Sequence, residues 1–159
     1  MDLNLKYFAI HAVYQYNLIM KIVSQNKKVG FLYQLYDKFE AGLVLSGIEV
    51  KSARNKKVNI STAYIKLLYH QNINPEIFLI GSDFGNKENI RSIKLLLNRQ
   101  EINKLIGKVQ EKNFTLVPLK LYFKRNILKL EFAVAKGLKK FDKRKKIREK
   151  EENKRIRNI

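Results

Sequence analysis

Residues 40–54, EAGLVLSGIEVKSAR, decide the fold of this chain because they switch from an alternating apolar pattern to a basic one. Every second residue at the start of the stretch is apolar, as in a strand with one face on a core. The core-facing positions are Ala41, Leu43 and Leu45. Gly47 breaks the alternation, and Glu40 is an isolated acid on the other face of the strand. We therefore expect a half-buried strand that ends near Gly47.

A short helical turn is expected after this strand. Its spacing directs Ile48, Val50 and Ala53 toward the core. Lys51 and Arg54 then remain on the outer side, where they form a basic surface suited to a polyanion.

The composition is that of a strongly basic chain of single-domain length. Its 159 residues include 33 Lys or Arg and 14 Asp or Glu, a formal net charge of +19. This charge favours a polyanionic partner, but alone it does not separate nucleic acid from an anionic membrane surface. The absence of cysteine excludes disulfides and thiolate metal sites. Residues 1–20 lack the pattern of a signal peptide or membrane span, and we expect an extension, with Met20 as an alternative start.

Alternation of apolar and polar residues elsewhere in the chain predicts two antiparallel hairpins. An aromatic-rich stretch that ends at residue 45 predicts a long strand. Pro118 cannot donate to a ladder, so we expect a sheet edge or a bulge there. The expected strands are residues 31–36, 39–45, 63–69, 76–80, 115–123 and 128–134.

The clearest helix follows Asn98, because Glu101 stands three residues later in a pattern close to a capping box. Apolar residues recur behind it at helical spacing and predict one buried stripe. The stripe consists of Ile102, Leu105, Ile106 and Val109. Short strands with two small helices favour a mainly β fold, a small antiparallel barrel of which the oligonucleotide-binding (OB) type is one example.

Residues 136–159 differ from the rest, since they hold too few apolar side chains to form a core. Opposite charges four residues apart, as at Lys145 and Glu149, favour a helix, but isolated helices of this length are marginal. We predict a basic tail that is disordered until bound, after an RNA-binding barrel at residues 21–135.

The sequence offers little for catalysis. Its only histidines are His11 and His70, and it contains no phosphate-binding glycine loop, metalloprotease motif or nucleophile elbow. We therefore predict no enzyme, no cofactor, no metal site and no small-molecule substrate. A metal-dependent nuclease that uses acids such as Asp83 and Glu88 is the minor alternative.

Nucleic-acid binding has more support, because lysines are interleaved with aromatic residues, as at Lys120, Tyr122 and Lys124. Lysine displaces counterions from phosphate, and aromatic faces stack on unpaired bases. Two kinds of protein fit this pattern equally well. One is a ribosomal or general RNA-binding structural module, and the other is a protein that binds one particular RNA.

Three segments, residues 39–54, 94–124 and 135–144, resemble the SsrA-binding protein family in order and spacing. The resemblance implies a noncatalytic, cytoplasmic protein with an OB-type barrel, flanking short helices and a basic C-terminal tail. The implied partners are transfer-messenger RNA, bound through its tRNA-like domain, and the decoding region of a stalled ribosome. No membrane partner is expected.

The family motifs and the basic pattern together give two sets of candidate residues. The predicted RNA contacts are Asn26, Lys27, Lys28, Glu40, Lys51, Arg54, Leu96, Asn98 and Lys124. The tail residues with an implied decoding-site role are Lys136, Lys139, Phe141, Asp142, Lys143 and Arg144. Other roles stay open: Asn98 is a good helix cap, Leu96 is suited to packing, and Glu40 is explained equally by an ion pair with a neighbouring lysine. Ile93 and Leu138 depart from the family pattern, because basic residues are usual there.

Overall fold

The structure, a computed structural model, describes residues 20–69, 74–85, 90–111 and 113–157, which form seven strands and four helices. The elements are β1 (Met20–Gln25), α2 (Val29–Leu32), β2 (Tyr33–Leu43), α3 (Gly47–Arg54), β3 (Tyr64–Leu68), β4 (Glu76–Ile80), β5 (Ile93–Leu96), α4 (Arg99–Gln110), β6 (Phe114–Lys124), β7 (Ile127–Gly137) and α5 (Lys140–Arg157).

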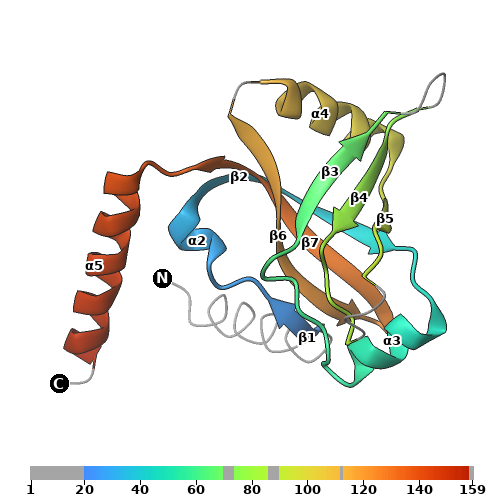
Figure 1. Cartoon of the computed structure of the whole chain (residues 1–159), viewed down its shortest axis with the longest axis horizontal. Coiled ribbons are helices and arrows are strands. Elements are labelled where there is room, and N and C mark those ends of the chain that lie inside the picture. Colours follow the sequence, from blue (N-terminus) through green and yellow to red (C-terminus); the bar gives the residue numbers. More distant parts are fainter. Residues whose placement is uncertain (1–19, 70–73, 86–89, 112, 158–159) are drawn as a thin grey trace, which may run out of the picture.

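Six of the strands close into a barrel (Figure 1). The pairing runs β6, β3, β4, β5, β2, β7 and returns to β6, and every pair is antiparallel. β3 meets β6 at Leu116, and β1 pairs with the later part of β6, from Lys120 to Lys124. A closed sheet leaves no long unpaired edge. The predicted mainly β, antiparallel barrel is therefore confirmed.

The barrel interior holds the main apolar core, because alternate residues of each strand point inward. In β4, for example, Ile77 and Leu79 are buried. Helix α4 lies across one end of the barrel, and α3 lies near the opposite end (Figure 1). Leu105 of α4 is buried in this core, and Ile102, Ile106 and Val109 pack against it, which confirms the predicted stripe.

Both hairpins agree with the sequence predictions, and so does the long strand except at its start, because Phe31 and Leu32 belong to α2 and not to the strand. β2 is one strand with an irregularity between Leu35 and Lys38, β3 pairs with β4, and β6 pairs with β7. The bulge predicted for Pro118 is present between Pro118 and Lys120. Strands β1 and β5 were missed, and the four residues of β5 are too few for an alternating pattern to stand out.

The helical turn expected after the first motif is the two-turn helix α3. Ala53 is buried as predicted, but Ile48 is 74% exposed, so its inward placement was wrong. Ile48 lies in the first turn, on a side of the helix that Ala53 does not share, and α3 packs through the Ala53 side.

The basic tail is helical in the structure, where we expected disorder until a partner binds. β7 runs to Gly137, so Lys136 still belongs to the sheet, opposite Gln34 of β2. Helix α5 follows and touches α2, where the Lys150 ammonium lies 4.3 Å from the centroid of the Phe31 ring. The opposite charges spaced four residues apart explain why this polar segment forms a helix.

None of the described helices is long and apolar enough to cross a membrane. The expected N-terminal extension lies outside the described residues except for Met20, which begins β1, and His11, His70 and Glu88 also lie outside them.

Candidate nucleic-acid interface

A network of carboxylates and lysines covers the outer face of β2, β7 and β6. The register sets Glu40 of β2 opposite Glu131 of β7, and Glu131 opposite Lys120 of β6. Two carboxylates that face each other directly repel and destabilise the strand pair, and the surrounding cations offset this repulsion. Glu131 forms ion pairs with Lys120 at 3.0 Å and with Lys38 at 3.8 Å.

Glu40 is bound by residues of the neighbouring strand β7 and of β6, the strand beyond it. The Lys124 ammonium lies 3.3 Å from both carboxylate oxygens, Lys129 Nζ lies 3.9 Å from Oε1, and the Tyr122 hydroxyl donates to Oε2. Burial raises the pKa of the Glu40 carboxyl, but the hydrogen bonds from Tyr122 and Lys124 and the charges of both lysines hold that pKa below its ordinary value of 4.5. Glu40 is therefore an anion at neutral pH that fixes two cations in place.

Tyr122 is not a stacking platform. Its side chain is 2% exposed, and the Lys120 ammonium lies 5.4 Å from the centre of its ring. The interleaved pattern of Lys120, Tyr122 and Lys124 therefore contributes surface cations and one buried phenol. The alternation of β6 places all three residues on the same face, and this is the signal that connects them to Glu40.

Leu96 lies on the same face as Glu40 and Lys124. One row of paired residues crosses four strands: Leu96, Gly42, Lys129 and Tyr122. A side chain at Gly42 would begin 3.4 Å from Leu96 Cβ, so the glycine leaves Leu96 uncovered on that side. Leu96 is 52% exposed, which favours contact with a partner over packing.

Asn98 follows this row and begins α4. Asn98 is the N-cap residue, and its backbone N–H donates to the Glu101 carboxylate at 2.9 Å, which is the Glu101 half of the predicted capping box. Asn98 is also exposed, and its amide carries both donors and an acceptor that a ribose or base could use.

The predicted contacts Asn26, Lys27 and Lys28 form the turn after β1. The Asn26 N–H donates to the Leu119 carbonyl at 2.8 Å, and the Asn26 side chain accepts from the Lys28 N–H at 3.3 Å. These bonds fix the turn beside β6, next to Lys120. Lys27 and Lys28 are exposed and extend the cationic face.

Lys51 and Arg54 are exposed on α3, near the other end of the barrel from α4 (Figure 1). The structure does not bring them into the Glu40 network. Helix α3 has a capping box: the Glu49 N–H donates to Ser46 Oγ at 3.4 Å, and the Ser46 N–H donates to Glu49 Oε2 at 2.7 Å.

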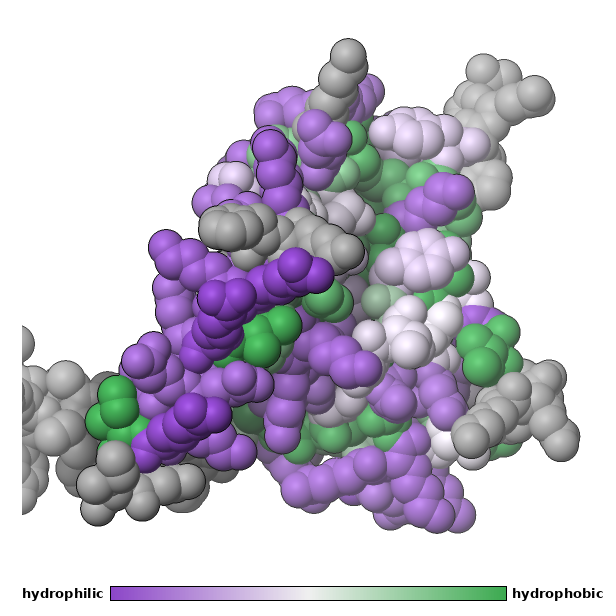
Figure 2. All heavy atoms as spheres, turned by 60° about the vertical axis from the view of Figure 1, so that its left-hand side comes forward, coloured by the Kyte–Doolittle hydropathy of each residue, from purple (hydrophilic) through white to green (hydrophobic). Residues whose placement is uncertain are grey.

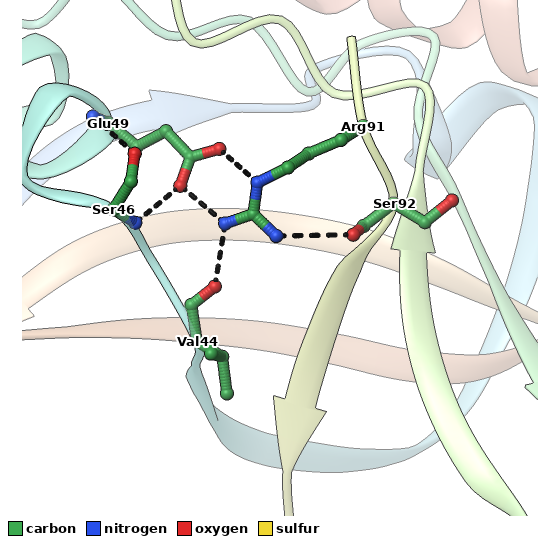
Figure 3. Close-up of polar contacts among 5 residues, drawn as sticks. All are labelled: Val44, Ser46, Glu49, Arg91 and Ser92. Atoms are coloured by element: carbon green, nitrogen blue, oxygen red, sulfur yellow. Dashed lines mark hydrogen bonds and ion pairs between the residues drawn. The ribbon is translucent and has the colours of Figure 1, made fainter.

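A second polar cluster, between Glu49 and Arg91, was missed in the sequence (Figure 3). Arg91 Nε and Nη2 donate to the two Glu49 oxygens at 2.9 and 2.6 Å, and Nη2 donates to the Val44 carbonyl at 3.0 Å. Burial raises the pKa of Glu49, but the hydrogen bonds from Arg91 and Ser46 hold it below the ordinary value. No local pattern signals a pair 42 residues apart in the chain.

The tail candidates begin at the end of β7. Lys136 is exposed at the end of that strand, Lys139 is exposed before α5, and Asp142 lies in the first turn of the helix. Lys143 and Arg144 come next, and the side chain of Phe141 lies outside the described part of the structure. The face that includes this region is mostly hydrophilic, with smaller apolar areas between the polar side chains (Figure 2).

Among the residues that the structure describes, no group of three His, Asp or Glu could hold a metal ion. The candidate interface presents cations, one exposed leucine and amide groups. These are the groups that read the phosphates and shape of RNA.

Comparisons with known proteins show which proteins this chain resembles. A family model described as SmpB protein matches residues 23–159. An SsrA-binding protein of Thermoanaerobacter pseudethanolicus is 48% identical over 134 residues, which cover 80% of this chain and 84% of the relative. An SsrA-binding protein of Geobacillus thermodenitrificans is 44% identical over 145 residues, 86% and 90% of the two chains. A solved structure described as "tmRNA-SmpB: a journey to the center of the bacterial ribosome" is 32% identical with a TM-score of 0.58, and covers 78% of this chain and 93% of its own.

Proposed function

Because this chain belongs to the SmpB protein family, we propose that it binds the tRNA-like domain of transfer-messenger RNA and delivers it to stalled ribosomes for trans-translation. The protein acts in the cytoplasm by binding alone and catalyses no reaction. The observation that carries this proposal is the cationic outer face of β2, β7 and β6, in which Glu40 holds Lys124 and Lys129.

This face suits a folded RNA better than a particular base sequence. Lys38, Lys120, Lys124 and Lys129 outnumber the two carboxylates of the network, so a positive excess remains for phosphates. Lysines that are already fixed on strands lose less conformational entropy when they bind than free ones do. A rigid, sequence-tolerant array of this kind matches the way proteins recognise structured RNA.

The flanking residues extend the contact area on both sides. The turn at residues 26–28 adds two exposed lysines beside β6, and Leu96 and Asn98 add an apolar and an amide contact beside β2. In this arrangement Glu40 acts chiefly by positioning cations.

The tail performs the second part of the function, in the decoding site and the messenger channel of the ribosome. Its described side chains are mostly exposed, and α5 touches the rest of the protein at α2. A basic helix attached at one end is free to change partners when it meets ribosomal RNA. The residues proposed to act there are Lys136, Lys139, Phe141, Asp142, Lys143 and Arg144.

Deletion of residues 142–159 tests this division of labour. The shortened chain is expected to bind the tRNA-like domain nearly as tightly as the full chain, because the barrel face is intact. It is expected to lose peptide tagging in a reconstituted translation reaction with stalled ribosomes. Loss of both activities, or retention of both, would contradict the separate roles of barrel and tail.

A further inference from the structure

A surface hollow of about 180 Å³ lies between α3 and the segment that leads into β5. Three apolar side chains and four polar ones line it: Ile48, Phe84, Ile93, Ser46, Ser82, Glu49 and Arg91. Pockets for drug-sized ligands usually measure about 300–1,000 Å³. The hollow therefore has room for one ring system but not for a whole nucleotide.

Most of the hydrogen-bonding edge of Arg91 is already occupied. Its nitrogens point to Glu49, to the Val44 carbonyl and to the Ser92 carbonyl, as Figure 3 shows. The side chain is nevertheless 46% exposed, so part of its surface is open to a ligand. Guanidinium faces stack on nucleic-acid bases, whereas a phosphate needs the edge donors. The neighbouring Glu49 carboxylate also repels an anion.

The packing of the fold does not explain why Ile48 is exposed or why the buried hydroxyl of Ser82 has no hydrogen-bond partner in the described structure. Ile48 is an exposed apolar side chain on an otherwise polar helix surface. Ser82 is buried, and its hydroxyl has no hydrogen-bond partner among the described residues. Buried polar groups of folded proteins normally have partners. The polar edge of a planar ligand could satisfy Ser82 after a rotation of its side chain, while Ile48 covers the ring.

We propose that this hollow holds one unstacked base of the bound RNA, against the face of Arg91 and the side chain of Ile48. Lys51 and Arg54, exposed on the same helix, contact the adjoining phosphates. The inference rests on the proposed function and deepens it, because it adds a base contact to the phosphate and shape contacts of the β2, β7 and β6 face.

A double-mutant cycle between protein and RNA tests the base contact. The probe is the tRNA-like domain of transfer-messenger RNA, synthesised with an abasic site at one unpaired nucleotide at a time. Each RNA is titrated with the full chain and with Ile48→Ala, a variant that keeps the fold because the side chain is exposed. We expect one abasic position to weaken binding by the full chain about 10-fold, the range measured for a single stacked base. Ile48→Ala should weaken binding of the intact RNA about 5-fold and have no further effect on that one abasic RNA.

Two controls accompany the cycle. Ile127→Ala removes another exposed isoleucine, next to the turn between β6 and β7, and should leave the affinity unchanged. Arg91→Lys keeps the charge but loses the planar face, so affinity should fall while the dependence of binding on salt concentration stays the same.

The inference is overturned if no single abasic site weakens binding. It is also overturned if, for every abasic RNA, the loss of affinity caused by Ile48→Ala is as large as it is for the intact RNA. Failure of the proposed function looks different. In that case the full chain would bind the intact tRNA-like domain no better than an unrelated tRNA.

Discussion

The hydroxyl of Tyr122 on β6 donates a hydrogen bond to the carboxylate of Glu40 on β2, across the intervening strand β7. The bond joins residues 82 positions apart and satisfies a phenol that is almost completely buried. It also fixes the carboxylate between Lys124 and Lys129. One hydrogen bond therefore connects the packing of the barrel to the arrangement of cations on its surface.

Tyr122→Phe should destabilise the fold by about 1–2 kcal/mol, because a hydrogen bond to a charged group is lost while the ring still fills its space. Urea denaturation measures the change. The matched control is Tyr64→Phe, since Tyr64 lies exposed on β3, and it should change stability by less than about 0.5 kcal/mol. Equal effects of the two substitutions would show that the Tyr122 hydroxyl contributes nothing specific.

The stability of the protein should depend on pH through Glu40. Its pKa is lower in the folded protein than the ordinary value of 4.5, so ionised Glu40 stabilises the fold above that pH. This contribution is lost as the pH falls through the folded-state pKa. In Glu40→Gln the contribution is missing at every pH, so the difference in unfolding free energy between wild type and variant should shrink as the pH falls below 4.5. Glu49, whose pKa is also lowered, adds a loss of the same sign to both proteins and cancels in the comparison. A difference that stays constant with pH would contradict the account.

Much of the fold could be predicted from the sequence because its signals are local. The hairpins follow from alternation within segments of five to eleven residues, and α4 follows from Asn98, Glu101 and the stripe around Leu105. The exposure of Ile48 could not be predicted in this way, since helical spacing alone does not say which side of a two-turn helix meets the core.

In the candidate site, too, local patterns predicted the residues but not the contacts between them. Glu40, Leu96 and Lys124 were named from motifs and charge, and the structure gathers them on one face. The contacts of Glu40 with Tyr122 and Lys129 depend on the register of three strands, which no local pattern states. The pair between Glu49 and Arg91 depends in the same way on how α3 meets the segment before β5.

Asn98→Asp separates the two roles of Asn98. Aspartate caps a helix as well as asparagine does, so the free energy of unfolding should change by less than about 0.5 kcal/mol. The added negative charge should weaken binding of the tRNA-like domain if Asn98 touches the RNA. Asn98→Ala tests the capping role instead, because alanine cannot cap the helix, and about 1 kcal/mol of stability should be lost. Unchanged RNA affinity in Asn98→Asp would leave Asn98 as a helix cap alone.

Lys150→Ala should loosen α5 from α2, because it removes the cation from the face of Phe31. Such a contact contributes about 0.5–1 kcal/mol at an exposed site. Hydrogen exchange of the α5 amides should become faster, while the barrel amides keep their rates. Lys154→Ala removes the same charge from an exposed position of the same helix and serves as the control. If both variants exchange alike, the Phe31 contact does not hold the helix.

The central claim is that the β2, β7 and β6 face recognises the tRNA-like domain of transfer-messenger RNA. The most direct test is a competition titration of the full chain with that domain and an unrelated tRNA over a range of salt concentrations. We predict tighter binding of the tRNA-like domain at every salt concentration. Lys124→Ala should reduce the slope of log affinity against log salt by about 0.7–0.9. Equal affinity for the two RNAs, with a slope unchanged in Lys124→Ala, would contradict the claim.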